Sequence, residues 1–162
     1  MTAAERAIAA ARAQGVTIAV AESLTGGAVT SALVSVPGAS AVLHGGVVAY
    51  ATPVKHTVLG VDAALLAAHG AVHPEVARQM ARGIRRALAV DAAEATLGVS
   101  TTGIAGPDSP DGQPVGTVYV GVSLGEASEA FAYAFDGDRA AIRQQATDAA
   151  LAALCRALGV TE

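Results

Sequence analysis

Apolar residues recur along the chain with two spacings, and these spacings predict alternating helices and strands. A return every three or four positions is typical of a helix with one buried face. This spacing follows His73-Pro74-Glu75 and is carried by Val76, Met80, Ile84 and Leu88. Helices are expected over residues 2–13, 26–36, 62–68 and 137–158, with a short one beginning at Thr52-Pro53 and a longer one at His73.

Continuous apolar runs rich in β-branched residues predict strands that are buried on both faces. These runs lie at residues 16–21, 41–51, 95–101, 115–124 and 130–136. A turn at Gly125-Glu126 joins the last two as an antiparallel pair, and Gly45-Gly46 marks a bulge or a close backbone approach. Because helices lie on either side of the strands in sequence, we expect an α/β fold, a single-domain α/β/α sandwich over residues 1–162 with a mixed sheet of about five strands.

Composition narrows the class of protein. Hydrophobic residues make up 52% of the chain and charged residues 15%, which favours a thoroughly buried sheet and a homo-oligomer. No uninterrupted apolar run has the roughly 18 residues of a membrane span. Glu5, Arg6 and Arg12 fall where a signal peptide needs its apolar segment, so a cytoplasmic protein is expected. The net charge of −4, without a basic stretch, argues against nucleic acid as a partner.

The first candidate site is the segment AVAESLTGG at residues 19–27, where a predicted strand turns through small residues into a helix. Such a turn leaves backbone N–H groups unpaired at the helix N-terminus and brings Ser23 to the end of a strand. These N–H groups attract a phosphate, a carboxylate or an oxyanion. The alternative is an ordinary capped helix start, with Ser23 or Thr25 as the N-cap residue.

The second candidate site contains the only lysine. The chain has ten Lys and Arg residues, and Lys55 stands alone among nine arginines. A lysine retained against such a bias indicates a position where arginine cannot serve, because arginine does not give up its proton. Lys55 is expected in the first turn of a helix, where the macrodipole favours the neutral amine, and Tyr50 closes the preceding strand and could relay a proton. The alternative is a surface lysine beside a tyrosine packed on the sheet.

A third strand ends in hydroxyls and glycines at Ser100–Pro107, where Thr102 and Gly103 could bind an anion through backbone amides. An ordinary glycine loop is the alternative. In an α/β sheet such loops meet at the carboxyl edge of the strands. We therefore expect the loops after Ala21, Ala51 and Thr101 to face one cleft.

Arg139 and Arg143 lie four residues apart near the start of the last helix. Positive charge there is unfavourable unless something negative lies opposite, either a substrate phosphate or a carboxylate such as Asp136 or Glu22. No metal site is expected, because Gly70 and Pro74 break the helix that would place His69 and His73 together. The usual ATP-binding, dinucleotide-binding and α/β-hydrolase motifs are missing from the sequence.

Five ordered motifs together resemble the CinA C-terminal family, which includes the nicotinamide-nucleotide amidases. They are AESLTGG at 21–27, GGVVAYATPVKHTVLGV at 45–61, TTGIAGPD at 101–108, PVGTVYVGV at 114–122 and GDRAAIRQQAT at 137–147. The resemblance implies hydrolysis of the carboxamide of nicotinamide mononucleotide to nicotinic acid mononucleotide and ammonia, without a metal or organic cofactor. It places the family's catalytic residues on Ser23, Tyr50 and Lys55.

The chemistry of amide hydrolysis agrees with these positions, since it needs an activated nucleophile, a bound oxyanion and an acid for the leaving ammonia. We expect Ser23 to attack while neutral Lys55 takes its proton, directly or through Tyr50, with backbone amides near Thr25-Gly26 binding the oxyanion. The nucleotide substrate is expected to contact Glu22, Thr25, Gly26, Gly27, Thr102, Gly103, Arg139 and Arg143. The alternatives are a catalytically silent domain that binds a nucleotide or a partner, and an amidase or esterase of the same mechanism with another small substrate.

Overall fold

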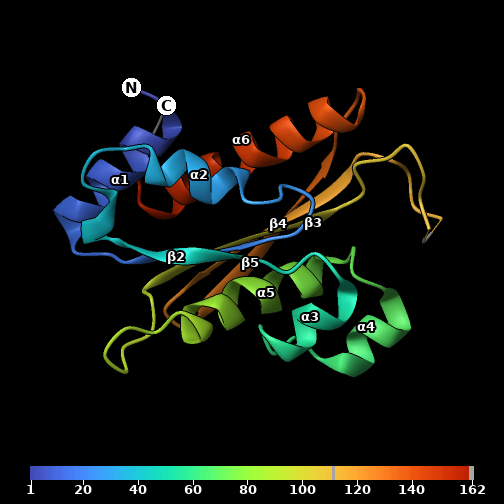
Figure 1. The fold of residues 1–162 in the computed structure, drawn as a ribbon, viewed down its shortest axis with the longest axis horizontal. Helices are drawn as coiled ribbons and strands as arrows, with labels where there is room; N and C mark the ends of the chain where they lie inside the picture. The colour runs from blue at the N-terminus through green and yellow to red at the C-terminus, as the bar shows by residue number, and fades with distance from the viewer. Residues whose placement is uncertain (111, 161–162) are drawn as a thin grey trace.

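A five-stranded mixed sheet lies between two layers of helices, as expected from the sequence (Figure 1). The computed structural model describes residues 1–110 and 112–160. The strand order is β2-β1-β3-β4-β5. Strands β2 and β3 each pair with β1 in parallel, while β4 pairs antiparallel with both β3 and β5. The strands are β1 (Ile18–Glu22), β2 (Leu43–Val48), β3 (Leu97–Gly103), β4 (Thr117–Leu124) and β5 (Ala127–Ala134).

The helices form one layer on each face of the sheet (Figure 1). One layer contains α1 (Ala3–Gln14), α2 (Ala28–Val34) and α6 (Arg139–Ala157). The other contains α3 (Thr52–Thr57), α4 (Ala63–His69) and α5 (Pro74–Ala87), and a short 3₁₀ turn, η1 (Ala39–Ala41), precedes β2. Because successive residues of a strand face opposite sides, Val20 joins the apolar core under α6 while Ala21 joins the core under α5. Both faces of β1 are therefore buried, which explains its uninterrupted apolar sequence.

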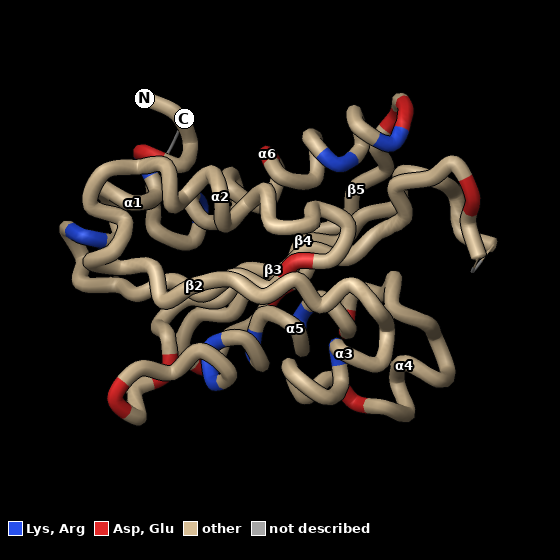
Figure 2. Tube along the Cα trace, viewed as in Figure 1, with Lys and Arg blue, Asp and Glu red and all other residues tan. Residues whose placement is uncertain are grey.

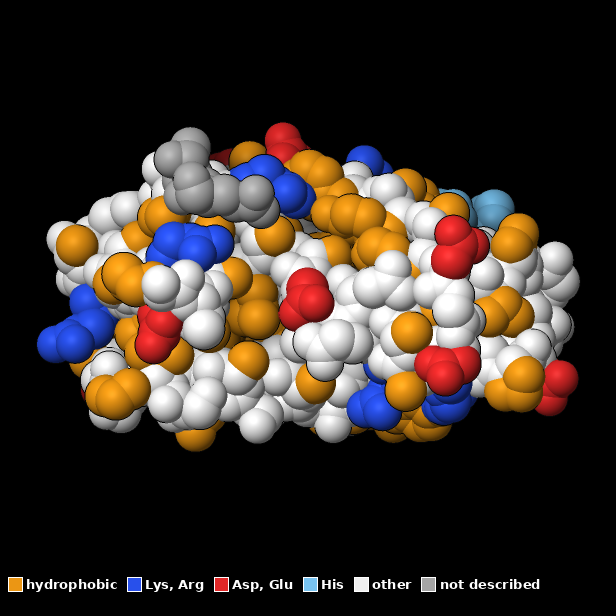
Figure 3. Space-filling view, turned by 90° about the horizontal axis from the view of Figure 1, so that it is seen from above, with side chains coloured by type: hydrophobic (Ala, Val, Ile, Leu, Met, Phe, Trp, Pro, Cys, Tyr) orange, Lys and Arg blue, Asp and Glu red, His pale blue; other side chains and the backbone are white. Residues whose placement is uncertain are grey.

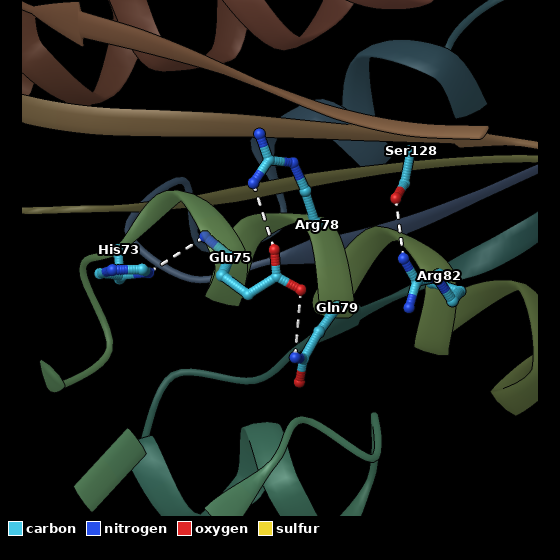
Figure 4. A network of polar contacts seen from close by, with 6 residues as sticks. All are labelled: His73, Glu75, Arg78, Gln79, Arg82 and Ser128. Atoms are coloured by element: carbon cyan, nitrogen blue, oxygen red, sulfur yellow. Dashed lines mark hydrogen bonds and ion pairs between the residues drawn. The ribbon is translucent and has the colours of Figure 1, made fainter. Parts of the chain in front are cut away.

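Helix α5 packs closely on the sheet and presents a polar face outward. A Cβ at Gly98 or at Gly121 would collide with backbone carbonyls of α5, so both glycines are needed for this approach. On the outer face the carboxylate of Glu75 accepts hydrogen bonds from Arg78 and Gln79 (Figure 4). The same figure shows further contacts of this helix, a bond from the Glu75 amide to His73 Nδ1 and one from Arg82 to Ser128 of β5.

Two helix starts differ from the expectation, and both differences bear on the site. Helix α2 begins after Gly27, an N-cap with φ of 100°, and neither Ser23 nor Thr25 caps it. Helix α3 has Ala51 as its N-cap and ends at Thr57, so Lys55 lies in its last turn instead of its first. The expected bulge in the second strand is confirmed, because the register between β1 and β2 shifts next to Gly45.

Charged residues lie mostly on helices, turns and loops, and the sheet carries few of them (Figure 2). Seen over α1, α2 and α6, the surface mixes apolar side chains with polar ones (Figure 3). No helix within residues 1–110 or 112–160 has the length and apolar character needed to cross a membrane.

Candidate active site

The turn between β1 and α2 brings Ser23 to the carboxyl edge of the sheet. Glu22 ends the strand, and the chain then reverses through Gly26 and Gly27, whose φ angles of 61° and 100° favour glycine. The Gly26 amide donates to the carbonyl of Ser23, and the Ala28 amide donates to that of Thr25. This turn, residues 23–27, is called the nucleophile turn below, after the role that the sequence analysis expects of Ser23.

Glu22 supplies the anion that the start of α2 was expected to bind. Its buried carboxylate accepts hydrogen bonds from the amides of Gly27, Val29 and Thr30 at 3.0 to 3.1 Å and from the Thr30 hydroxyl at 2.7 Å. A carboxylate at this position satisfies the free N–H groups and the positive end of the helix dipole. Glu22 and Gly27, both expected to contact the substrate, bond to each other instead and do not line the cleft described below.

Lys55 reaches the nucleophile turn from α3 and is almost fully enclosed, with 1% of its surface exposed. Its Nζ lies 3.0 Å from Ser23 Oγ, 2.6 Å from the carbonyl oxygen of Ala49 and 3.3 Å from that of Tyr50. A neutral amine has two N–H donors and one lone pair. When the two carbonyls accept the two donors, the lone pair is left for the hydroxyl proton of Ser23.

Burial lowers the pKa of Lys55 from 10.5 to about 8. The cause is the loss of water around the charged form and not the helix dipole invoked from the sequence, since Lys55 lies in the last turn of α3. At neutral pH roughly a tenth of the molecules then hold the amine uncharged. The position of Lys55 and its lowered pKa would therefore allow the amine to accept a proton from Ser23.

The phenol of Tyr50 does not bridge Ser23 and Lys55. The tyrosine forms a hydrogen bond with Lys55 through its backbone carbonyl alone, and 62% of the residue's surface is exposed. The phenolic oxygen instead accepts a hydrogen bond from Arg139 Nη2 at 3.2 Å. The structure therefore contains a direct contact between Ser23 and Lys55 and no contact between them through the Tyr50 phenol.

Two buried threonine hydroxyls lie behind the nucleophile turn. Thr101 Oγ1 accepts a hydrogen bond from the Ser23 amide at 3.3 Å and lies 2.8 Å from Thr25 Oγ1. Both threonines are fully buried and do not line the cleft, so the side chain of Thr25 supports the turn and does not face the cleft. Thr102, the next residue of β3, does line the cleft, and its hydroxyl donates to the carbonyl of Ala71.

The two arginines of α6 have different surroundings. Arg143 donates from Nε to the Leu24 carbonyl at 2.8 Å and from Nη2 to the Thr25 carbonyl at 3.3 Å, and it does not line the cleft. It therefore holds the nucleophile turn, and the phosphate or carboxylate expected beside it is replaced by these carbonyls. Arg139 does line the cleft and donates to the carbonyl of Gly106 at 2.6 Å.

A cleft of about 660 Å³ opens above Ser23 and Lys55. The loops that follow β1, β2 and β3 all contribute to it, which confirms the expected convergence at one edge of the sheet. Of the expected site residues, the cleft is lined by Ser23, Tyr50, Lys55, Thr102, Gly103 and Arg139. Sequence reasoning missed Thr52, Asp108 and the α4–α5 connection at 70–72, although Thr52 and Asp108 stand inside recognised motifs. Within the described part of the chain no three His, Cys, Asp or Glu residues group as a metal site.

Comparison with known proteins identifies the family. The family model of the CinA C-terminal domain matches residues 1–158. The chain belongs to the CinA C-terminal domain family. A CinA-like protein of Anaeromyxobacter dehalogenans (strain 2CP-C) is 53% identical over 148 residues, which cover 90% of this chain and 35% of that protein. The chain thus spans about a third of the length of this CinA relative.

Solved structures of the CinA superfamily share the whole fold. A competence-damaged (CinA) superfamily protein from Klebsiella pneumoniae 700603 superposes with a TM-score of 0.90 at 33% identity, covering 97% of this chain and 96% of that one. The competence/damage inducible protein CihA from Agrobacterium tumefaciens gives a TM-score of 0.87 at 33% identity, with 97% and 93% of the two chains covered. None of these names states a reaction.

Proposed function

We propose that the chain is an amidohydrolase that converts nicotinamide mononucleotide to nicotinic acid mononucleotide and ammonia through an acyl-enzyme on Ser23. The observation that supports this most is the 3.0 Å contact between Ser23 Oγ and the enclosed amine of Lys55. A hydroxyl beside a base of lowered pKa is the arrangement of an activated nucleophile. The pair lies in a cleft of about 660 Å³, a size that suits a mononucleotide.

In the first half of the proposed reaction, Lys55 takes the hydroxyl proton of Ser23 while Oγ attacks the carboxamide carbon. The amides of Leu24 and Thr25 are candidates to bind the tetrahedral oxyanion, since neither donates to an acceptor within the described residues. The Gly26 amide is excluded from this role because it donates to the Ser23 carbonyl. The C–N bond then breaks, Lys55 returns the proton to the leaving nitrogen, and ammonia departs.

In the second half, water replaces ammonia and the same groups act in the same order. Lys55 takes a proton from water, the resulting hydroxide attacks the ester carbon, and the ester bond to Ser23 Oγ breaks. The proton returns to Oγ, and the carboxylic acid that is formed releases its own proton to solvent and leaves as a carboxylate. Neither half requires a metal or an organic cofactor.

The decisive experiment measures ammonia release from nicotinamide mononucleotide by the intact chain and by three variants. Ser23→Ala should abolish release, and Lys55→Arg should reduce it by orders of magnitude because arginine stays charged. Ser40→Ala, an exposed serine, is the control and should retain the wild-type rate. Circular dichroism would verify that each variant is folded.

Mass spectrometry of rapidly quenched wild-type protein should show an adduct of the nucleotide acyl group, absent from Ser23→Ala. No ammonia from the wild-type chain would contradict the proposal and favour a silent binding domain. Near-normal release by Lys55→Arg would show that Lys55 is not the base.

A further inference from the structure

Arg139 lies at the mouth of the cleft and joins two segments that are far apart in sequence. Its Nη1 donates to the carbonyl of Gly106 at 2.6 Å, and its Nη2 donates to the phenolic oxygen of Tyr50 at 3.2 Å. Both Tyr50 and Arg139 line the cleft that contains Ser23. The pair therefore faces any molecule bound over the nucleophile.

The positive charge of Arg139 has no carboxylate partner among the described residues. Within that part of the chain the one ion pair joins Arg78 to Glu75, so neither Asp136 nor Glu22 compensates Arg139. Asp108 lines the same cleft without lying within ion-pair distance of the guanidinium. Of the two alternatives left open by the sequence, a carboxylate partner or an anionic ligand, the geometry favours the ligand.

The donors of this pair suit a phosphate monoester. A guanidinium has five N–H donors, and the contacts to Gly106 and Tyr50 use two of them. The Tyr50 oxygen accepts from Arg139, which leaves the phenolic proton free to be donated in turn. Three N–H groups in a planar fork with an adjacent O–H can bind several oxygens of one phosphate at once.

We propose that Tyr50 and Arg139 form the subsite for the phosphate of the substrate, and that Tyr50 binds substrate instead of transferring a proton. The assignment rests on the proposed function, which supplies a mononucleotide as the ligand. The backbone and the side chain of Tyr50 have different partners. Its carbonyl accepts a hydrogen bond from Lys55, while its phenol lies at the mouth of the cleft and accepts one from Arg139. Arg143 has no share in the subsite, because it holds the nucleophile turn.

The test compares nicotinamide mononucleotide with nicotinamide riboside, which has the same reacting carboxamide and lacks the phosphate. Tyr50→Phe should raise KM for the mononucleotide about tenfold, the cost of one charge-assisted hydrogen bond. Arg139→Gln should raise it further, while KM for the riboside should change less than twofold in both variants. The matched control is Tyr133→Phe, which removes a tyrosine–arginine bond of the same kind, to Arg156, outside the cleft.

Calorimetric titration of Ser23→Ala protein with both compounds tests the subsite without turnover. The preference of this protein for the mononucleotide over the riboside should fall when Tyr50→Phe or Arg139→Gln is added. A preference lost in this way supports the subsite even if the wild-type chain releases no ammonia, so the two proposals can fail separately. An unchanged preference, or a Tyr50→Phe variant whose kcat falls a hundredfold on both substrates, would overturn the assignment and restore the proton relay.

Discussion

The amine of Lys55 is both buried and held by hydrogen bonds to two backbone carbonyls. Burial removes water from around the charged form of the amine. Its hydrogen bonds to the carbonyls of Ala49 and Tyr50 fix the direction in which the lone pair of the neutral amine points. Desolvation makes the amine a base near neutral pH, and the two carbonyls aim its lone pair at Ser23. An arginine could reproduce the charge and the donors but not the loss of the proton.

The lowered pKa of Lys55 predicts a pH dependence of catalysis. Because the neutral amine is the active form, kcat/KM should rise with pH and level off above pH 8, falling about tenfold for each pH unit below it. The measurement is a pH–rate profile with nicotinamide mononucleotide between pH 6 and 9.5. A profile that is flat, or that declines as the pH rises toward 8, is incompatible with Lys55 as the base.

At the scale of elements, the nucleophile turn is held from three sides. Glu22 fixes the start of α2, Thr101 of β3 accepts the Ser23 amide, and Arg143 of α6 binds the carbonyls of Leu24 and Thr25. Because a peptide carbonyl and the following N–H point in opposite directions, holding the Leu24 carbonyl also orients the Thr25 amide. The position of the nucleophile is therefore set by contacts between elements that are distant in sequence.

Removing the donors of Arg143 should slow turnover without weakening binding. We expect Arg143→Met to lower kcat by roughly 10- to 100-fold, because an ångström-scale displacement of a reacting group has effects of this order. KM for nicotinamide mononucleotide should stay within twofold, since Arg143 does not line the cleft. Steady-state kinetics of Arg143→Met beside Arg139→Gln provide the contrast, and a rise in KM as the main effect in Arg143→Met would contradict the assigned role.

The sequence predicted the elements better than the contacts made by individual side chains. Apolar spacing was sufficient for the five strands and their covering helices, and the solitary lysine was enough to single out Lys55. The roles of Glu22 and Arg143 were not predictable from the sequence. Whether such a side chain faces the cleft or binds backbone groups depends on how α2 and α6 pack against the sheet. Tyr50 illustrates the same limit, since its carbonyl and its phenol serve different partners.

At the scale of the whole molecule, the strand order explains where the site forms. Strand β1 lies between β2 and β3 with all three parallel, so their carboxyl ends share one edge of the sheet. Ser23, the segment leading to Lys55 and the end of β3 meet there, which is where α/β sheets form ligand clefts. The same architecture encloses Lys55, so the protonation of its amine is coupled to the stability of the fold.

This coupling predicts a pH-dependent stability. The folded-state pKa of Lys55, about 8, lies below the unfolded value of 10.5, so the unfolded chain binds more protons between these values and the free energy of unfolding rises with pH. Relative to Lys55→Met, the wild type should gain about 3 kcal/mol between pH 8 and 10.5. Urea unfolding of both proteins across this range measures the difference, and a constant difference would show that the amine is not perturbed.

The proposed reaction requires the Lys55 amine to lose its proton near neutral pH while it lies against Ser23. The chain contains one lysine, so labelling lysine with ¹³C at Cε gives a single side-chain signal for NMR titration. We expect a midpoint near 8 in the folded protein and near 10.5 in urea. A folded-state midpoint at the unfolded value would contradict it.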